Sequence, residues 1–312
     1  MAGAAESGAR LHFGQLIFYT FAAKEETQPM PIIDAAWRSW LTTNAGRGCS
    51  AQSMIDAMVE AGFDSAAADV AVQETLGAHG GVEASPARGP SGEYRYDRGP
   101  VAAGNRIRAR DRDVTVLMRS ERPQVILFGD VMSPGECAEM IERSRHRLRR
   151  STTVHPETGR EDVIQNRTSE GVWFQRGEDE FIKRLDDRIA SLMNWPVENG
   201  EGLQILHYNV GGEYRPHFDY FPPDQAGSTV HTARGGQRVA TLVVYLNDVP
   251  AGGETVFPEV GLSVGARQGC AVYFRYMNAM RQLDPLTLHG GAPVLAGDKW
   301  IMTKWVREQP YV

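Results

Sequence analysis

The sequence predicts an α+β fold, with a double-stranded β-helix (jelly roll) core buttressed by helices and preceded by a small helical unit. Two observations support this. Before residue 202, apolar residues recur at helical spacing, and after it short β-branched and aromatic runs alternate with Gly, Pro and Asn-Asp turns. Short strands at such spacing suit two packed antiparallel sheets. A chain of 312 residues can hold one large domain and a smaller unit.

Composition divides the chain into four segments. Residues 1–30 lack a sustained period and are predicted to be a tail. Residues 31–77 carry apolar residues at helical spacing and form a predicted helical module, whose role is docking or simple stabilisation because nothing in it carries chemistry. Residues 78–112 are rich in Gly, Pro, Arg and Ala, which is typical of a linker. The main domain is therefore predicted to span 113–312.

Within the main domain, helices are predicted before strands. Ser133 at the N-cap, Pro134 at the first helical position and Glu136 at the third predict a helix that begins at Pro134. A second helix is predicted from Asp179 to Met193, which has one apolar face. Strands are predicted at residues 125–128, 203–208, 239–246, 270–276 and 300–307.

Charge and cysteine usage narrow the class of protein. A net charge of -6 and a pI near 5.8 provide no basic field for phosphate backbones, so nucleic acid is not expected as a partner. Cys49, Cys137 and Cys270 are far apart and odd in number, which disfavours a disulfide framework and a zinc site. The apolar run at 16–23 makes a poor signal peptide, and no run approaches the ~18 residues of a membrane helix. We expect a cytoplasmic protein, with export as the minor alternative.

One short motif suggests a metal site. His217 and Asp219 are two residues apart, so on a strand both side chains would point to the same face. His-x-Asp alone is a common chance match. A second histidine, His289, would complete the set of two histidines and one carboxylate that non-haem Fe(II) oxygenases use. Three protein ligands would leave positions open for a bidentate 2-oxo acid and O2.

Lys299 is the other unusual residue. It follows His289 by ten positions and lies inside a strand-like apolar run. A buried ammonium is costly unless its charge is paired, and a dicarboxylate cosubstrate would supply the partner. The alternative is that Lys299 only starts the strand and stays solvated.

Short strings in a fixed order run from Gln204 to Trp305. They are His207-Tyr208, residues 216–221 (PHFDYF), 235–241 (GGQRVAT), 252–258 (GGETVFP), 284–291 (DPLTLHGG), Lys299-Trp300 and Thr303-Lys304-Trp305. This stretch resembles the catalytic core of the prolyl 4-hydroxylase branch of the 2-oxoglutarate dioxygenases. Weaker similarity extends upstream to about Pro123, so the resemblance covers the main domain and not the first 110 residues.

The resemblance implies a catalytic and metal set. His217, Asp219 and His289 would bind Fe(II), and Lys299 would form a salt bridge with 2-oxoglutarate. Tyr208 and Thr255 would donate hydrogen bonds to the same distal carboxylate, or Tyr208 is an ordinary strand aromatic. The implied cofactors are Fe(II), 2-oxoglutarate, O2 and ascorbate as reductant. Because the carboxylate of Asp219 is present, halogenation is not expected.

The implied substrate groove contains Tyr214, Arg238 and Trp305. Each has a simpler interpretation: Tyr214 as a strand aromatic, Arg238 as a surface ion-pair partner, and Trp305 as core filler. The implied reaction is C4 hydroxylation of a prolyl residue in a peptide or protein, with release of succinate and CO2. One alternative is hydroxylation of a free amino acid or small metabolite on the same scaffold. Another is a non-catalytic peptide-binding protein, although such a protein would be expected to have lost an iron ligand. The oligomeric state is left open.

Overall fold

The computed structural model describes residues 33–46, 51–79, 94–151, 153–154, 161–162 and 168–311. The predicted tail, Cys49 and residues 80–93 of the predicted linker lie outside this part of the chain. Within the described ranges, no helix combines the length and the hydrophobicity that crossing a bilayer requires.

The larger sheet has nine strands, all paired antiparallel, in the order β1-β2-β3-β14-β10-β17-β8-β7-β4. The strands in chain order are β1 Arg106–Ala109, β2 Arg112–Glu121, β3 Gln124–Gly129, β4 Arg149–Arg150, β7 Glu170–Phe174, β8 Leu203–Tyr208, β10 Arg238–Tyr245, β14 Ala271–Arg275 and β17 Lys299–Arg307. The five strands predicted from the sequence are confirmed to within about a residue at each end, and β17 starts at Lys299.

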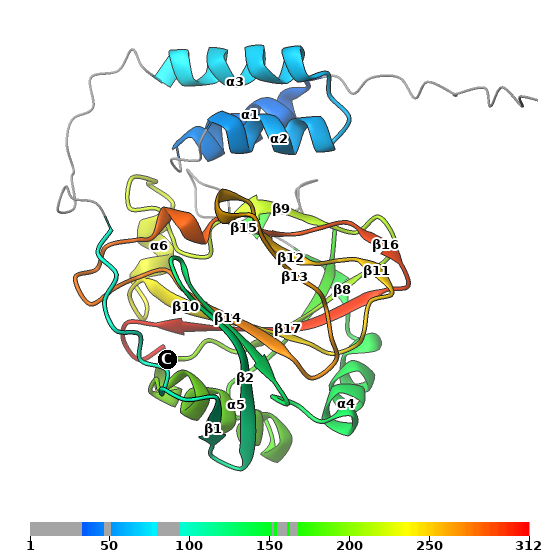
Figure 1. Ribbon diagram of the computed structural model, residues 1–312, viewed down its shortest axis with the longest axis vertical. Helices are drawn as coiled ribbons and strands as arrows, with labels where there is room; N and C mark the ends of the chain where they lie inside the picture. Colours follow the sequence, from blue (N-terminus) through cyan, green and yellow to red (C-terminus); the bar gives the residue numbers. More distant parts are fainter. Residues whose placement is uncertain are drawn as a thin grey trace, which may run out of the picture.

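The smaller sheet has four strands in the order β13-β12-β15-β9. Two further pairs of strands, β11 with β16 and β5 with β6, form separate two-stranded ribbons. The bounds are β9 Tyr214–His217, β12 Thr255–Phe257, β13 Leu262–Val264 and β15 His289–Gly291, with β11 Ala251–Gly252, β16 Val294–Ala296, β5 Thr153–Val154 and β6 Glu161–Asp162 in the ribbons. Side chains of both sheets share one buried cluster, for example Tyr245 with Phe257 and Leu288. Figure 1 shows the smaller sheet above the long strands of the larger one. The predicted jelly-roll core buttressed by helices is confirmed.

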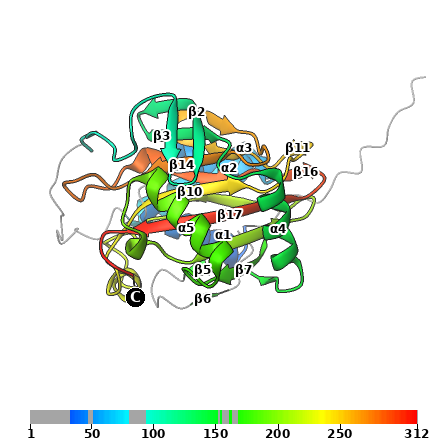
Figure 2. The same ribbon diagram turned by 90° about the horizontal axis from the view of Figure 1, so that it is seen from below.

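Two helices cover the opposite face of the larger sheet, as Figure 2 shows from below. They are α4, Pro134–Arg145, and α5, Glu180–Met193. Their apolar residues, such as Met140 and Leu185, share a buried cluster with alternate residues of β8, β10 and β17. The capping box predicted at Ser133 and Glu136 is present. Asp179 is the N-cap of α5 rather than its first residue, because its side chain accepts bonds from the first backbone N–H groups.

Part of the predicted linker differs from expectation. Strand β1 lies inside residues 78–112 and pairs with β2 at the edge of the larger sheet. The Arg-rich composition of this segment concealed its alternation, in which Ile107 and Ala109 face the core. The preceding strap is also fixed to the domain, since Asp97 pairs with buried Arg275 of β14. Residues 94–112 therefore pack on the main domain, while the division of the chain into domains stays a prediction.

The N-terminal helices fall where the helical module was predicted: α1 Ala35–Gly46, α2 Ala51–Glu60 and α3 Ser65–His79. They lie on the side of the smaller sheet (Figure 1). The guanidinium carbon of Arg215, on β9, lies 3.9 Å from the centroid of the Trp37 ring on α1. This cation–π contact connects the helical module to the strand that carries His217.

Candidate active site

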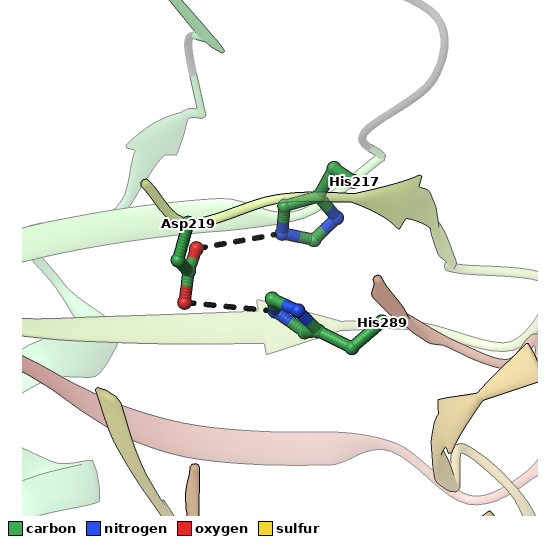
Figure 3. Close-up of side chains that lie close together, drawn as sticks. All are labelled: His217, Asp219 and His289. Atoms are coloured by element: carbon green, nitrogen blue, oxygen red, sulfur yellow. Dashed lines mark ion pairs between the residues drawn. The ribbon is translucent and has the colours of Figure 1, made fainter. Parts of the chain in front are cut away.

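Two histidines of the smaller sheet and one aspartate just beyond it converge at one point. His217 ends β9 and His289 begins β15, and the antiparallel register places them opposite each other. Asp219 lies two residues past His217, just beyond the end of β9. His217 Nε2 is 3.6 Å from Asp219 Oδ1, and His289 Nε2 is 3.5 Å from Asp219 Oδ2 (Figure 3). Strand alternation, which predicted the pair, therefore stops at His217, and the turn that follows delivers the carboxylate.

Neighbouring groups orient each member of this triad. His217 Nδ1 lies 2.8 Å from the carbonyl oxygen of Arg215, and His289 Nδ1 lies 3.0 Å from that of Thr287. An Nδ1–H that donates to a carbonyl leaves Nε2 as the free ligand atom. The hydroxyl of Thr241 donates to Asp219 Oδ2 at 2.6 Å. The sequence had placed Thr241 within a family string without giving it a role.

The protonation states suit a metal. All three side chains are buried. Burial opposes ionisation of Asp219, but His289, His217 and Arg238 together hold the pKa of its carboxyl well below its usual range. Burial lowers the pKa of His289 to about 4, against the opposing influence of Asp219. Two imidazole nitrogens and one carboxylate oxygen, all within 4.8 Å of one another, are a donor set that fits Fe(II) with open positions.

Lys299 lies deep in the protein without an ionic partner. Its side chain is 3% exposed, and it forms no ion pair with any residue of the described chain. Burial lowers the pKa of its ammonium to about 8, against the opposing influence of Glu254, which lies beyond ion-pair distance. A Cβ added to Gly291 would lie 3.5 Å from Lys299 Nζ, so the end of the lysine reaches the strand that begins with His289. A buried ammonium in this position fits a carboxylate ligand, and the solvated alternative is wrong.

Tyr208 and Thr255 lie near the same place. Tyr208 is opposite Lys299 in the β17–β8 register, and Lys299 Nζ is 5.5 Å from the centroid of its ring. Thr255 is opposite Gly291 in the β12–β15 register. Its hydroxyl oxygen accepts a hydrogen bond of 2.8 Å from Tyr245, which is fully buried. Sequence reasoning had no basis for assigning Tyr245 a role at the site. It lies four residues after Thr241 on β10, and therefore on the same face of the strand.

The three candidate substrate residues lie around the triad. The Tyr214 ring stacks on the His217 ring, with centroids 3.6 Å apart. Arg238 Nη1 is 3.3 Å from the carbonyl oxygen of Asp219, and its guanidinium carbon is 4.2 Å from the centroid of Trp305. Arg238 is indeed an ion-pair partner, but a half-buried one rather than a surface one: its side chain is 16% exposed, and it binds Glu201 through two bonds of 2.7 and 2.9 Å. Sequence reasoning missed Glu201, which precedes the family strings.

Comparison with known proteins agrees with this geometry. The profile of the 2OG-Fe(II) oxygenase superfamily matches residues 203–307. The chain is 39% identical over 211 residues to probable prolyl 4-hydroxylase 3 of Arabidopsis thaliana, covering 62% of this chain and 72% of that protein. It is 39% identical over 189 residues to prolyl 4-hydroxylase subunit alpha-1 of Rattus norvegicus, covering 61% of this chain and 35% of that subunit.

Among solved structures, the chain is similar to the viral collagen prolyl hydroxylase vCPH from Paramecium Bursaria Chlorella virus-1, in its 2OG complex. The sequences are 28% identical, the TM-score is 0.47, and the match covers 59% of this chain and 95% of that one.

The fold and the triad define an Fe(II)- and 2-oxoglutarate-dependent dioxygenase, and the matched profile covers every member of the triad together with Lys299. Its relatives place it more closely. The chain belongs to the prolyl 4-hydroxylase family of 2OG-Fe(II) oxygenases. The family, the enzyme class, the metal and the cosubstrate predicted from the sequence are thereby confirmed.

Proposed function

We propose that this enzyme hydroxylates prolyl residues at C4 in a peptide or protein, and that His217, Asp219 and His289 hold its iron. The observation that carries the proposal is the buried triad with the unpaired ammonium of Lys299 beside it. Bound Fe(II), with ascorbate as reductant, supplies the activation of O2 that couples decarboxylation of 2-oxoglutarate to hydroxylation. The protein contributes orientation of the reactants and exclusion of water.

On the cosubstrate side, Lys299 would bind the distal carboxylate of 2-oxoglutarate as a charge-assisted pair. Thr255 would donate a hydrogen bond to the same carboxylate. Because its oxygen already accepts the bond from Tyr245, its own hydroxyl hydrogen is free to point to another acceptor. Tyr208, opposite Lys299, would be the second hydroxyl donor to that carboxylate.

On the substrate side, Arg238 and Trp305 offer donors next to the triad. The indole Nε1 of Trp305 is buried and has no hydrogen-bond partner among the described residues. A buried donor without a partner is costly, and a peptide carbonyl would satisfy it. Tyr214, stacked on His217, would close the other side of the groove. The names of the matched relatives, prolyl 4-hydroxylases, support a prolyl substrate.

The direct test is mass spectrometry of proline-containing peptides incubated with enzyme, Fe(II), 2-oxoglutarate and ascorbate. We expect the mass of one oxygen to be gained on proline, with one succinate released per product and 4-hydroxyproline found after hydrolysis. The His217→Ala variant should lose both signals. Oxygenation of free proline but not of peptides would support the alternative, a small-metabolite hydroxylase. No succinate release with any proline compound would contradict the proposal.

A cytoplasmic location is also part of this proposal, and the scattered, odd-numbered cysteines support it. Fractionation of cells that express the tagged protein would test it.

A further inference from the structure

The segment that carries Asp219 belongs to no helix or strand. Strand β9 ends at His217, and residues 218–222 follow it outside both sheets, although Asp219 and Phe221 are buried. Asp219 nevertheless presents its carboxylate to both imidazole rings of the triad, as Figure 3 shows. Because a backbone without regular pairing has many conformations open to it, other groups must fix this one.

The side chain of Gln237 holds the backbone of Phe221 at both of its polar groups. Phe221 N donates to Gln237 Oε1 at 2.8 Å, and Gln237 Nε2 donates to the carbonyl oxygen of Phe221 at 2.6 Å. These two bonds, which we call the amide clamp, replace the pair of bonds that a neighbouring strand would supply. Gln237 is 7% exposed, so little water competes for them.

Gln237 is itself fixed in front of β10. Its backbone N donates to Glu308 Oε2 at 2.7 Å, and its carbonyl oxygen accepts from Glu308 N at 3.0 Å. Gln237 Oε1 also accepts from the backbone N of Arg238 at 2.9 Å. Since both the main chain and the side-chain amide of Gln237 are held, the amide clamp ties Phe221 to the start of β10.

Two further contacts connect β10 to the same segment. The hydroxyl of Thr241 donates to Asp219 Oδ2, and Arg238 Nη1 lies 3.3 Å from the carbonyl oxygen of Asp219. They hold Asp219 directly, and the amide clamp holds the chain two residues later. A segment anchored at both 219 and 221 has less freedom to turn its carboxylate away than one anchored at 219 alone. The ligand is thus oriented by contacts within the protein.

We propose that Gln237 is a positioning residue for the iron ligand Asp219, and that its amide clamp on Phe221 sets the backbone from which the carboxylate reaches the metal. The inference rests on the iron site of the proposed function. Gln237 is not a member of the triad, and it acts through the segment 219–221. Loss of the amide clamp should therefore weaken metal binding by the folded protein, separately from any loss of stability.

The test is the affinity of the metal-free protein for Fe(II), measured by calorimetric titration under anaerobic conditions. Gln237→Met keeps the approximate volume of the side chain and removes both bonds. We expect the dissociation constant to rise about tenfold, the lower end of the range for groups that orient metal ligands. Gln237→Asn keeps an amide but is one methylene shorter, so it should lose affinity too. This polar variant keeps the proposal testable if the Met variant does not fold.

The matched control is Asn278→Leu, which removes another buried side-chain amide. Asn278 is 2% exposed; it donates to the carbonyl oxygen of Arg95 and accepts from the backbone N of Met280 and of Gln282. Among the described residues, none of its bonds goes to the segment 217–221. Asn278→Leu should lower the unfolding free energy in urea and leave the Fe(II) dissociation constant unchanged.

Three results would contradict these expectations in different ways. A folded Gln237→Met or Gln237→Asn protein that is less stable but binds Fe(II) as tightly as the wild type would give the amide clamp a purely structural role and overturn the proposal. An equal loss of Fe(II) affinity in Asn278→Leu would overturn it as well, since any buried amide would then suffice. If the wild type itself does not bind Fe(II), the proposed function fails.

Discussion

Strand β17 carries two buried lysines that differ in one respect. Lys299 is 3% exposed and Lys304 is 2% exposed. Lys304 Nζ lies 2.6 Å from Asp186 Oδ1 on α5 and also contacts the carbonyl oxygen of Glu201. Lys299 has no ionic partner in the described chain. The two positions have opposite parity along the strand, so they face opposite sides of the sheet.

Burial combined with the presence or absence of an ion pair separates a lysine with a structural role from a lysine with a binding role. Burial lowers the pKa of both ammonium groups, because it disfavours the charged form. On the helix side the protein provides the counter-charge, and the pair connects α5 to the sheet. On the side of the iron site, Lys299 forms no ion pair within the described chain, and Glu254 influences it only from beyond ion-pair distance. A buried charge left without a partner is a position prepared for a ligand.

The largest effect is expected when the ion pair of Lys304 is broken. Lys304→Met would leave Asp186, which is 1% exposed, as an uncompensated buried charge. Removing one partner of a buried pair costs about 3–5 kcal/mol of unfolding free energy, which urea denaturation would measure. Adding Asp186→Leu should recover most of that loss, since the remaining charge is then gone. A loss below about 1 kcal/mol in the single variant would show that the pair is not structural.

Substitution of Lys299, which has no ion pair among the described residues, should weaken the binding of 2-oxoglutarate instead of the fold. In Lys299→Met no partner is abandoned inside the protein, so the unfolding free energy should not fall. The distal carboxylate of 2-oxoglutarate loses its counter-charge, and truncation of a buried charge partner corresponds to a loss of about 30-fold or more in affinity. The KM for 2-oxoglutarate in succinate release would report it. An unaltered KM would mean that Lys299 does not bind the cosubstrate.

The pH dependence of cosubstrate binding tests whether the charge of Lys299 holds the distal carboxylate. Burial lowers the pKa of free Lys299 to about 8, and a bound carboxylate would favour its charged form. Below this pKa the affinity should be constant; above it, the dissociation constant should rise by up to about tenfold per pH unit. Titration of 2-oxoglutarate under anaerobic conditions from neutral to alkaline pH would measure this. Lys299→Arg, whose guanidinium stays charged, should show no such rise.

The smallest change in unfolding free energy is expected for substitution of a third lysine. Lys183 on α5 has a side chain that is 55% exposed, and its Nζ lies 2.9 Å from the carboxylate of Asp187. Solvent screens this pair, so Lys183→Ala should change the unfolding free energy by no more than about 0.5 kcal/mol. This variant is the surface control for Lys304→Met in the same denaturation series. A loss as large as that of Lys304→Met would remove the distinction between buried and exposed pairs.

The metal centre could be predicted because the His217-x-Asp219 motif, a chance match by itself, is followed in order by His289 and by Lys299, a charge in an apolar run. Local spacing could not predict features that depend on pairing between distant strands. Glu201 binds Arg238 only after β8 and β10 are placed on either side of β17. The contact between the tilted rings of Trp173 on β7 and Trp305 on β17, with centroids 5.7 Å apart, likewise requires the β7–β8–β17 register.

Within a correctly predicted fold class, strand β1 was missed for the same kind of reason. The helices and central strands carry strong local patterns, and they were predicted nearly to their ends. Strand β1 has only four residues, two of them arginines, and its place at the sheet edge comes from pairing with β2 rather than from its own hydrophobicity. Tertiary pairing here outweighed composition.

Arg215 has contacts in two directions. Its backbone carbonyl accepts the bond that orients the His217 ring, while its guanidinium lies on the Trp37 ring of α1. One residue is thus a mechanical link between a helical appendage without chemistry and the first iron ligand. A substitution of Trp37 would therefore remove a contact from the same residue whose carbonyl fixes the His217 ring, while the Arg215–Glu213 ion pair would remain.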